Sequence, residues 1–215
     1  MNKFILNYLG LFFILLSVLS FFNIVYSYYF NLYLNINTYF YTFCISLIIG
    51  LFSFFYKSLD SKITIYQKIF AVFIGYILLP LVIAIPIYLS IYNVSFLDCY
   101  FEAISGFTST GFTIFDNIKH IDESLILWRS TSQWIGGIYF LFSILLLIDI
   151  FDNSLRKSLT NFITFSYSEI FKQFVKILIL YTSLTFFIFL ILKLIDLRTF
   201  DSFNLSMTII SSGGF

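Results

Sequence analysis

Residues 101–113 read Phe-Glu-Ala-Ile-Ser-Gly-Phe-Thr-Ser-Thr-Gly-Phe-Thr. This stretch is too polar, and too rich in Gly, Ser and Thr, to cross a bilayer. It is also too apolar and aromatic for an ordinary solvent-exposed loop. It lies between two apolar segments that are long enough to span a membrane. A short amphipathic run that ends in a hydroxyl- and glycine-rich turn between two spans is typical of a re-entrant pore loop, so we expect this turn to line an ion path.

The composition places the chain in a bilayer. Of its 215 residues, 60% are hydrophobic and only 11% are charged, whereas a soluble domain carries roughly 25% charged residues. The net charge of +1 gives no indication of nucleic acid, and none is expected as a partner. Cys44 and Cys99 form no disulfide framework and are predicted to be free thiols. His120 is the only histidine, so a histidine-based metal site has no support.

Five apolar runs are predicted to be transmembrane helices, and the N-terminal run is interpreted as a retained span because no small-residue cleavage site follows it. The runs are residues 4–22, 39–56, 69–92, 134–151 and 177–195. The adjacent Gly136 and Gly137 are interpreted as packing residues, which let this helix approach the pore loop closely.

The basic residues predict a cytoplasmic N-terminus. With five spans threaded from that side, eight of the twelve Lys and Arg residues are cytoplasmic and four are outside. The eight are Lys3, Lys57, Lys62, Lys68, Arg156, Lys157, Lys172 and Lys176. Arg129, one of the outer four, is expected either to anchor the outer end of its span or to pair with Glu102 or Glu123.

The end of the chain resembles the opening stretch. At an offset of 103 residues, Gly111-Phe112 aligns with Gly214-Phe215, and Asp98 aligns with Asp201. An offset of 102 aligns Gly111 with Gly213 instead. We prefer the first register because it keeps Gly followed by Phe, and both remain open. The repeating unit is a span, a short helix, a glycine turn and a span.

This unit suits cation passage. An extended turn supplies backbone carbonyls that replace the water shell of the ion, and glycine allows successive carbonyls to point the same way. The short helix directs its partly negative C-terminal end at the ion. The candidate filter residues are Thr108, Ser109, Thr110, Gly111, Phe112, Ser211, Ser212, Gly213 and Gly214.

Three segments resemble the Trk/Ktr potassium-transporter superfamily. Residues 101–111 look like its first pore loop, Leu127-Trp-Arg-Ser-Thr-Ser-Gln-Trp-Ile-Gly-Gly137 is similar to the start of the following helix, and residues 211–215 resemble the second filter. The resemblance implies an all-α polytopic membrane protein with two N-terminal transmembrane helices, followed by helix–pore loop–helix repeats of the K⁺-channel type. One filter glycine per repeat maps to Gly111 and to Gly214 or Gly213.

The resemblance also implies what the protein does and with what. It implies K⁺ as the transported ion, bound by filter carbonyls without a side-chain metal site, and no cofactor in this chain. It further implies a homodimer, a cytosolic nucleotide-binding regulatory subunit of the TrkA type, and a multi-pass location in the bacterial inner membrane.

The predicted organisation is a two-helix hairpin (1–66), a first complete repeat (67–152), a cytoplasmic linker (153–172) and the start of a second repeat (173–215). About one and a half repeats are present where the resemblance implies four, so we expect an N-terminal fragment. Two alternatives remain open. One is a small non-transporting membrane subunit. The other is a membrane-embedded enzyme that uses the Ser/Thr-rich turn, with Glu102 as the nearest carboxylate to Ser109.

Overall fold

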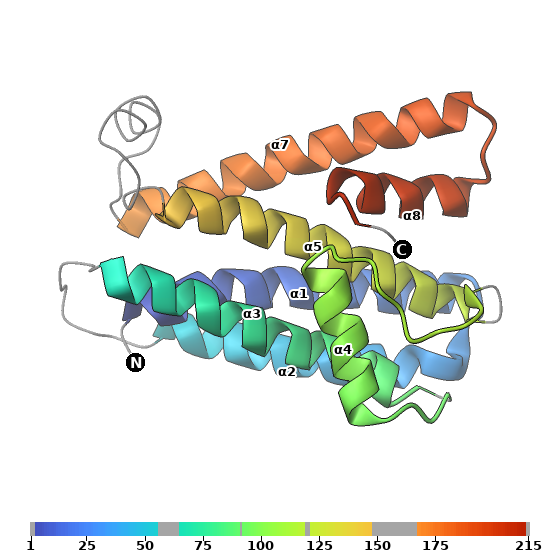
Figure 1. The fold of residues 1–215 in the computed structure, drawn as a ribbon, viewed down its shortest axis with the longest axis horizontal. Helices are drawn as coiled ribbons and strands as arrows, with labels where there is room; N and C mark the ends of the chain where they lie inside the picture. Colours follow the sequence, from blue (N-terminus) through green and yellow to red (C-terminus); the bar gives the residue numbers. More distant parts are fainter. Residues whose placement is uncertain (1–2, 56–64, 91, 119–120, 148–166, 214–215) are drawn as a thin grey trace.

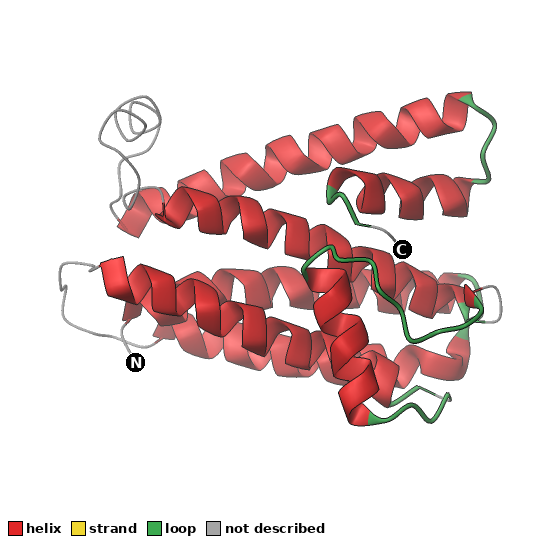
Figure 2. Ribbon diagram, viewed as in Figure 1, coloured by secondary structure: helices red, strands yellow, loops and turns green. Residues whose placement is uncertain are grey.

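The computed structural model describes residues 3–55, 65–90, 92–118, 121–147 and 167–213. Within these ranges all regular structure is helical (Figure 2). The elements are α1 (Lys3–Tyr29), the 3₁₀-helix η1 (Tyr33–Asn35), α2 (Ile36–Phe55), α3 (Ile65–Tyr88), α4 (Phe96–Phe107), α5 (Glu123–Leu147), α7 (Tyr167–Leu194) and α8 (Thr199–Ile210).

Five segments are long and apolar enough to cross a membrane, which agrees with the number predicted. They are Ile5–Tyr29, Tyr33–Ser53, Ile65–Tyr88, Glu123–Leu147 and Phe171–Leu194. They lie side by side along the long axis of the molecule (Figure 1).

The predicted start of the fourth span is wrong. The helix begins at Glu123 rather than at Trp134. Its first turns carry Ser124, Arg129 and Gln133, which lower the hydropathy, yet all three side chains are buried. These side chains face protein rather than lipid, so the mean hydropathy of the segment does not reveal that the helix begins here.

The short helices α4 and α8 do not span the bundle. Each has 12 residues, which is too short to cross a ~30 Å hydrocarbon core. α8 turns back beside α7 and ends partway along it, while α4 crosses the bundle steeply and ends against α5 (Figure 1). The α4 N-terminus is capped by Ser95, whose Oγ accepts a hydrogen bond from the backbone N–H of Asp98 at 3.2 Å.

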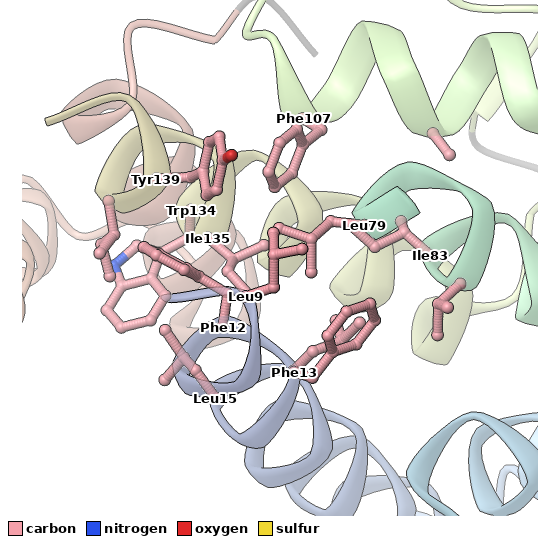
Figure 3. Packing of buried hydrophobic residues seen from close by; sticks show 14 of the residues in the cluster. Leu9, Phe12, Phe13, Leu15, Leu79, Ile83, Phe107, Trp134, Ile135 and Tyr139 are labelled. Carbon is pink, nitrogen blue, oxygen red and sulfur yellow. The ribbon is translucent and has the colours of Figure 1, made fainter. Parts of the chain in front are cut away.

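An aromatic core joins α1 to the C-terminal end of α4 (Figure 3). The ring centroids of Phe12 and Tyr139 are 4.7 Å apart, and those of Tyr139 and Phe107 are 5.2 Å apart. Tyr139 is also fixed by the hydrogen bond that its hydroxyl donates to the carbonyl of Val72 at 2.7 Å. The N-terminal helix is therefore packed into the same core that holds the end of α4.

Candidate functional site

The two short helices correspond residue by residue. The same 103 residues separate Phe96 from Thr199 and Phe107 from Ile210, the first and last residues of α4 and α8. Each helix is followed by a turn, the first turn (residues 108–112) and the second turn (residues 211–213 of those described). The correspondence in helix length and spacing matches the preferred offset of 103.

The hydrogen bonds of the two turns also correspond at this spacing. The Thr110 N–H donates to the Ser105 carbonyl at 3.0 Å, and the Gly213 N–H donates to the Thr208 carbonyl at 2.8 Å. One residue earlier, the N–H groups of Ser109 and Ser212 donate to carbonyls three residues back, each at 3.0 Å. Both helices therefore end in the same chain reversal.

Left-handed backbone conformations occupy matching positions as well. Ser109 and Ser212 both have φ of 56°, and Gly111 has φ of 80°. A side chain at φ near 60° costs roughly 1–2 kcal/mol because Cβ crowds the following carbonyl. Gly111 avoids that cost. Gly214, its counterpart at this spacing, lies outside the described residues.

Gly136 faces the last residue of α4, and Gly137 faces the second turn. A Cβ on Gly136 would overlap the carbonyl oxygen of Phe107 and stand 2.8 Å from its Cα. A Cβ on Gly137 would overlap the Tyr181 hydroxyl and stand 3.1 Å from Cβ of Ser211. Their predicted role in helix packing is confirmed, since they lie against the end of α4 and the start of the second turn.

A buried ion pair holds the segment that follows the first turn. Arg129 Nη2 lies 2.7 Å from Glu102 Oε1, and the side chains are 3% and 1% exposed. The other carboxylate oxygen accepts the backbone N–H of Ile114 at 2.8 Å, and Arg129 Nη2 also donates to the Thr113 hydroxyl at 3.0 Å. Of the alternatives for Arg129, pairing with Glu102 is correct, and the outer-end anchor is wrong.

One more side chain fixes the first turn from within α4. The Ser105 hydroxyl donates to the carbonyl of Phe112 at 2.6 Å. Like Arg129, it lies behind the turn rather than in it. Ser105 was not among the residues predicted from the sequence, where its only signal is a small hydroxyl residue on the buried side of an amphipathic helix.

A cavity of about 580 Å³ lies between the two turns. Four of the predicted site residues line it, Thr108 and Ser109 from the first turn and Ser211 and Ser212 from the second. Because both short helices end here, their partly negative C-terminal ends meet at this cavity. Thr110, Gly111, Phe112 and Gly213 do not line it.

The known proteins that this chain is similar to are cation and potassium transporters. The chain is 30% identical over 194 residues to an uncharacterized cation transporter of Methanocaldococcus jannaschii, which covers 86% of this chain and 40% of that protein. It is 40% identical over 60 residues to the Trk system potassium uptake protein TrkI of Halomonas elongata, 28% of this chain and 11% of that protein. With TrkG of Escherichia coli it shares 34% over 64 residues, 29% of this chain and 13% of that protein. No protein-family model matches.

A solved structure has the same fold. The crystal structure of the potassium transporter TrkH from Vibrio parahaemolyticus aligns with a TM-score of 0.72 at 20% identity, over 95% of this chain and 42% of that chain. Fold and sequence together define a multi-pass, all-helical membrane protein. The chain shares its fold with TrkH and is similar in sequence to cation and potassium transporters. It spans about 40% of the length of the Methanocaldococcus relative.

Proposed function

We propose that this chain is a membrane subunit of a potassium uptake system, and that K⁺ passes a filter built partly from its two turns. The observation that carries the proposal is the pair of 12-residue helices that end in the same reversal, 103 residues apart, around one cavity. A repeated non-spanning helix that aims its C-terminal end at a common space is suited to a desolvated cation. The named relatives are cation and potassium transporters rather than enzymes.

The proposed filter residues are the nine predicted from the sequence. Backbone carbonyls are the proposed ligands, because the hydroxyls of Thr108 and Thr110 already bond to each other at 2.7 Å. Gly111, with φ of 80°, is the proposed filter glycine of the first turn. Glu102, Arg129 and Ser105 are not proposed to contact the ion. They support the filter indirectly, because they bond to the chain at residues 112–114.

The location, partners and domain division that we propose are those implied by the resemblance to Trk proteins. We propose an inner-membrane location with a cytoplasmic N-terminus, a homodimer and a regulatory subunit of the TrkA type. We also propose the division into a hairpin (1–66), a first repeat (67–152), a linker (153–172) and a second repeat (173–215). Residues 153–166 of the linker lie outside the described part of the chain.

Uptake in a potassium-deficient host tests the function. The full-length protein is expected to restore growth at low K⁺, and absence of ⁸⁶Rb⁺ or K⁺ uptake by a protein that reaches the membrane would reject it. Gly111→Ser is expected to lower the preference for K⁺ over Na⁺. Ser58→Gly, which is remote from both turns in the sequence, is the matched control. Unchanged selectivity in Gly111→Ser would remove Gly111 from the filter.

A further inference from the structure

Gly213 of the second turn packs against a side chain of α5, that of Gln133. A Cβ on Gly213 would overlap Oε1 of Gln133 and stand 2.8 Å from its Nε2. The amide of Gln133 therefore occupies the space that a side chain at position 213 would need. Because Gln133 is fully buried, it has little room to move aside.

Backbone conformation does not require glycine at position 213. Among the described glycines, only Gly111 has a positive φ. At the spacing of 103, the residue that corresponds to Gly213 is Thr110, whose N–H makes the same hydrogen bond to the carbonyl five residues back. Thr110 is exposed, and its hydroxyl donates to the carbonyl of Ser105 at 3.2 Å, so a side chain fits at this position. The backbone conformation at this place in the turn is thus compatible with a side chain, since Thr110 stands there in the first turn and Gly213 in the second.

The side-chain amide of Gln133 has no hydrogen-bond partner among the described residues. Both its Oε1 and its Nε2 are buried. An unpaired buried amide costs about 1–3 kcal/mol. Hydrogen bonding within the described part of the chain therefore does not fix this side chain, and its amide lies against Gly213 of the second turn.

From these three observations we infer that Gln133 is a positioning residue for the second turn, and that Gly213 is glycine in order to admit its amide. This inference rests on the proposed function. On the sequence alignment at an offset of 103, Gly214 stays the counterpart of Gly111 and the proposed filter glycine. The inference also makes α5 of the first repeat a determinant of the second filter segment. It also removes Gly213 from the nine proposed filter residues, because its role is then to pack against Gln133.

A suppressor experiment in the full-length protein tests this contact. Gly213→Ala is expected to lower the melting temperature of the purified protein by several degrees and its K⁺ over Na⁺ uptake ratio several-fold. Adding Gln133→Ala removes the amide and is expected to restore most of both. Adding Gln133→Met, which keeps the length of the side chain, is the matched control and is expected to restore neither.

Three outcomes overturn the inference. They are a Gly213→Ala protein that behaves as wild type, an equal defect with and without Gln133→Ala, and equal rescue by Gln133→Ala and Gln133→Met. Gly214→Ala separates the two glycines, because its selectivity defect should persist in the Gln133→Ala background. If the protein moves no K⁺, the proposed function fails, while the melting temperatures still test the contact.

Discussion

Arg129 of α5 and Glu102 of α4 form an ion pair with 2.7 Å between Nη2 and Oε1. A second bond joins Arg129 Nε to the same oxygen at 2.8 Å. The geometry is bidentate from the side of the guanidinium, and the carboxylate also accepts the N–H of Ile114. The pair therefore links two helices and the chain that leaves the first turn.

Breaking this pair is expected to be costly. Glu102→Gln leaves a buried guanidinium without its countercharge, and Arg129→Gln leaves a buried carboxylate, each at about 3–5 kcal/mol. Both variants should unfold at clearly lower temperature in detergent, and both should lose K⁺ over Na⁺ selectivity. The control is Arg198→Gln, because Arg198 is 61% exposed in its pairs with Glu123 and Asp201. Equal losses from all three variants would contradict a special role for the buried pair.

Apolarity alone predicted the number of spans but not the start of α5. Hydropathy reports whether a segment suits lipid, whereas the first turns of α5 are buried against protein. Ser124 bonds to Tyr39 of α2, Trp128 to the carbonyl of Ile83 in α3, and Arg129 to Glu102 of α4. Arg129 bonds to Glu102 and to Thr113, just after the first turn, and Gln133 lies against Gly213 of the second turn. The feature that misled the span prediction is thus the same one that supports the candidate site.

The correspondence between α4 and α8 could be predicted because the same short motifs occur at both places in a chain of low complexity. The register was less certain, since offsets of 102 and 103 each match several residues. Helix ends and matching φ values at Ser109 and Ser212 favour 103. The contact between Gln133 and Gly213 could not be predicted, because it depends on the distance between two helices that the sequence does not specify.

Gly136 and Gly137 are expected to differ in their tolerance of alanine. Gly136→Ala meets a backbone carbonyl, that of Phe107, which moves only if α4 moves. Gly137→Ala first meets the Tyr181 hydroxyl, which belongs to a side chain. We expect Gly136→Ala to abolish stable expression and Gly137→Ala to be milder, with partial rescue by Tyr181→Phe. Fluorescence-detected size-exclusion chromatography measures both, and a Gly137→Ala defect that Tyr181→Phe does not relieve would count against this contact.

Ser109 and Ser212 test the backbone of the two turns. Because φ is 56° at both residues, replacement by glycine removes a strain of roughly 1 kcal/mol. Replacement by valine adds to the strain, since β-branched residues tolerate this region poorly. We expect the glycine variants to melt at or above the wild-type temperature and the valine variants well below it. Thr110→Val, one residue along and without positive φ, should be milder than Ser109→Val, and the reverse order would refute the assigned conformation.

Cys99 is expected to resist thiol reagents. It is fully buried in α4, and burial raises the pKa of its thiol to about 11. The reactive thiolate is therefore scarce from pH 6 to pH 9, and labelling by a maleimide should stay slow across that range. Leu97→Cys, at a position that is 76% exposed on the same helix, supplies the comparison in a Cys44→Ser background. Rapid labelling of Cys99 at neutral pH would show that α4 does not pack as described.

Phe12 tests whether the N-terminal hairpin supports the site. Its ring packs against Tyr139 at 4.7 Å and Phe174 at 5.3 Å between centroids, and Tyr139 in turn contacts Phe107 at the end of α4. Truncation of a buried phenylalanine costs about 3–5 kcal/mol. Because Tyr139 loses a neighbour on one side, the end of α4 should loosen as well.

We therefore expect Phe12→Ala to lower both the melting temperature and K⁺ over Na⁺ selectivity, although residue 12 lies far from either turn in the sequence. Phe52→Ala is the matched control, since Phe52 is 66% exposed on α2 and its removal opens no cavity. If Phe12→Ala lowers stability but leaves selectivity unchanged, the aromatic chain supports the fold without setting the position of α4. Loss of both only in Phe12→Ala would show that α1 acts on the first turn through Tyr139 and Phe107.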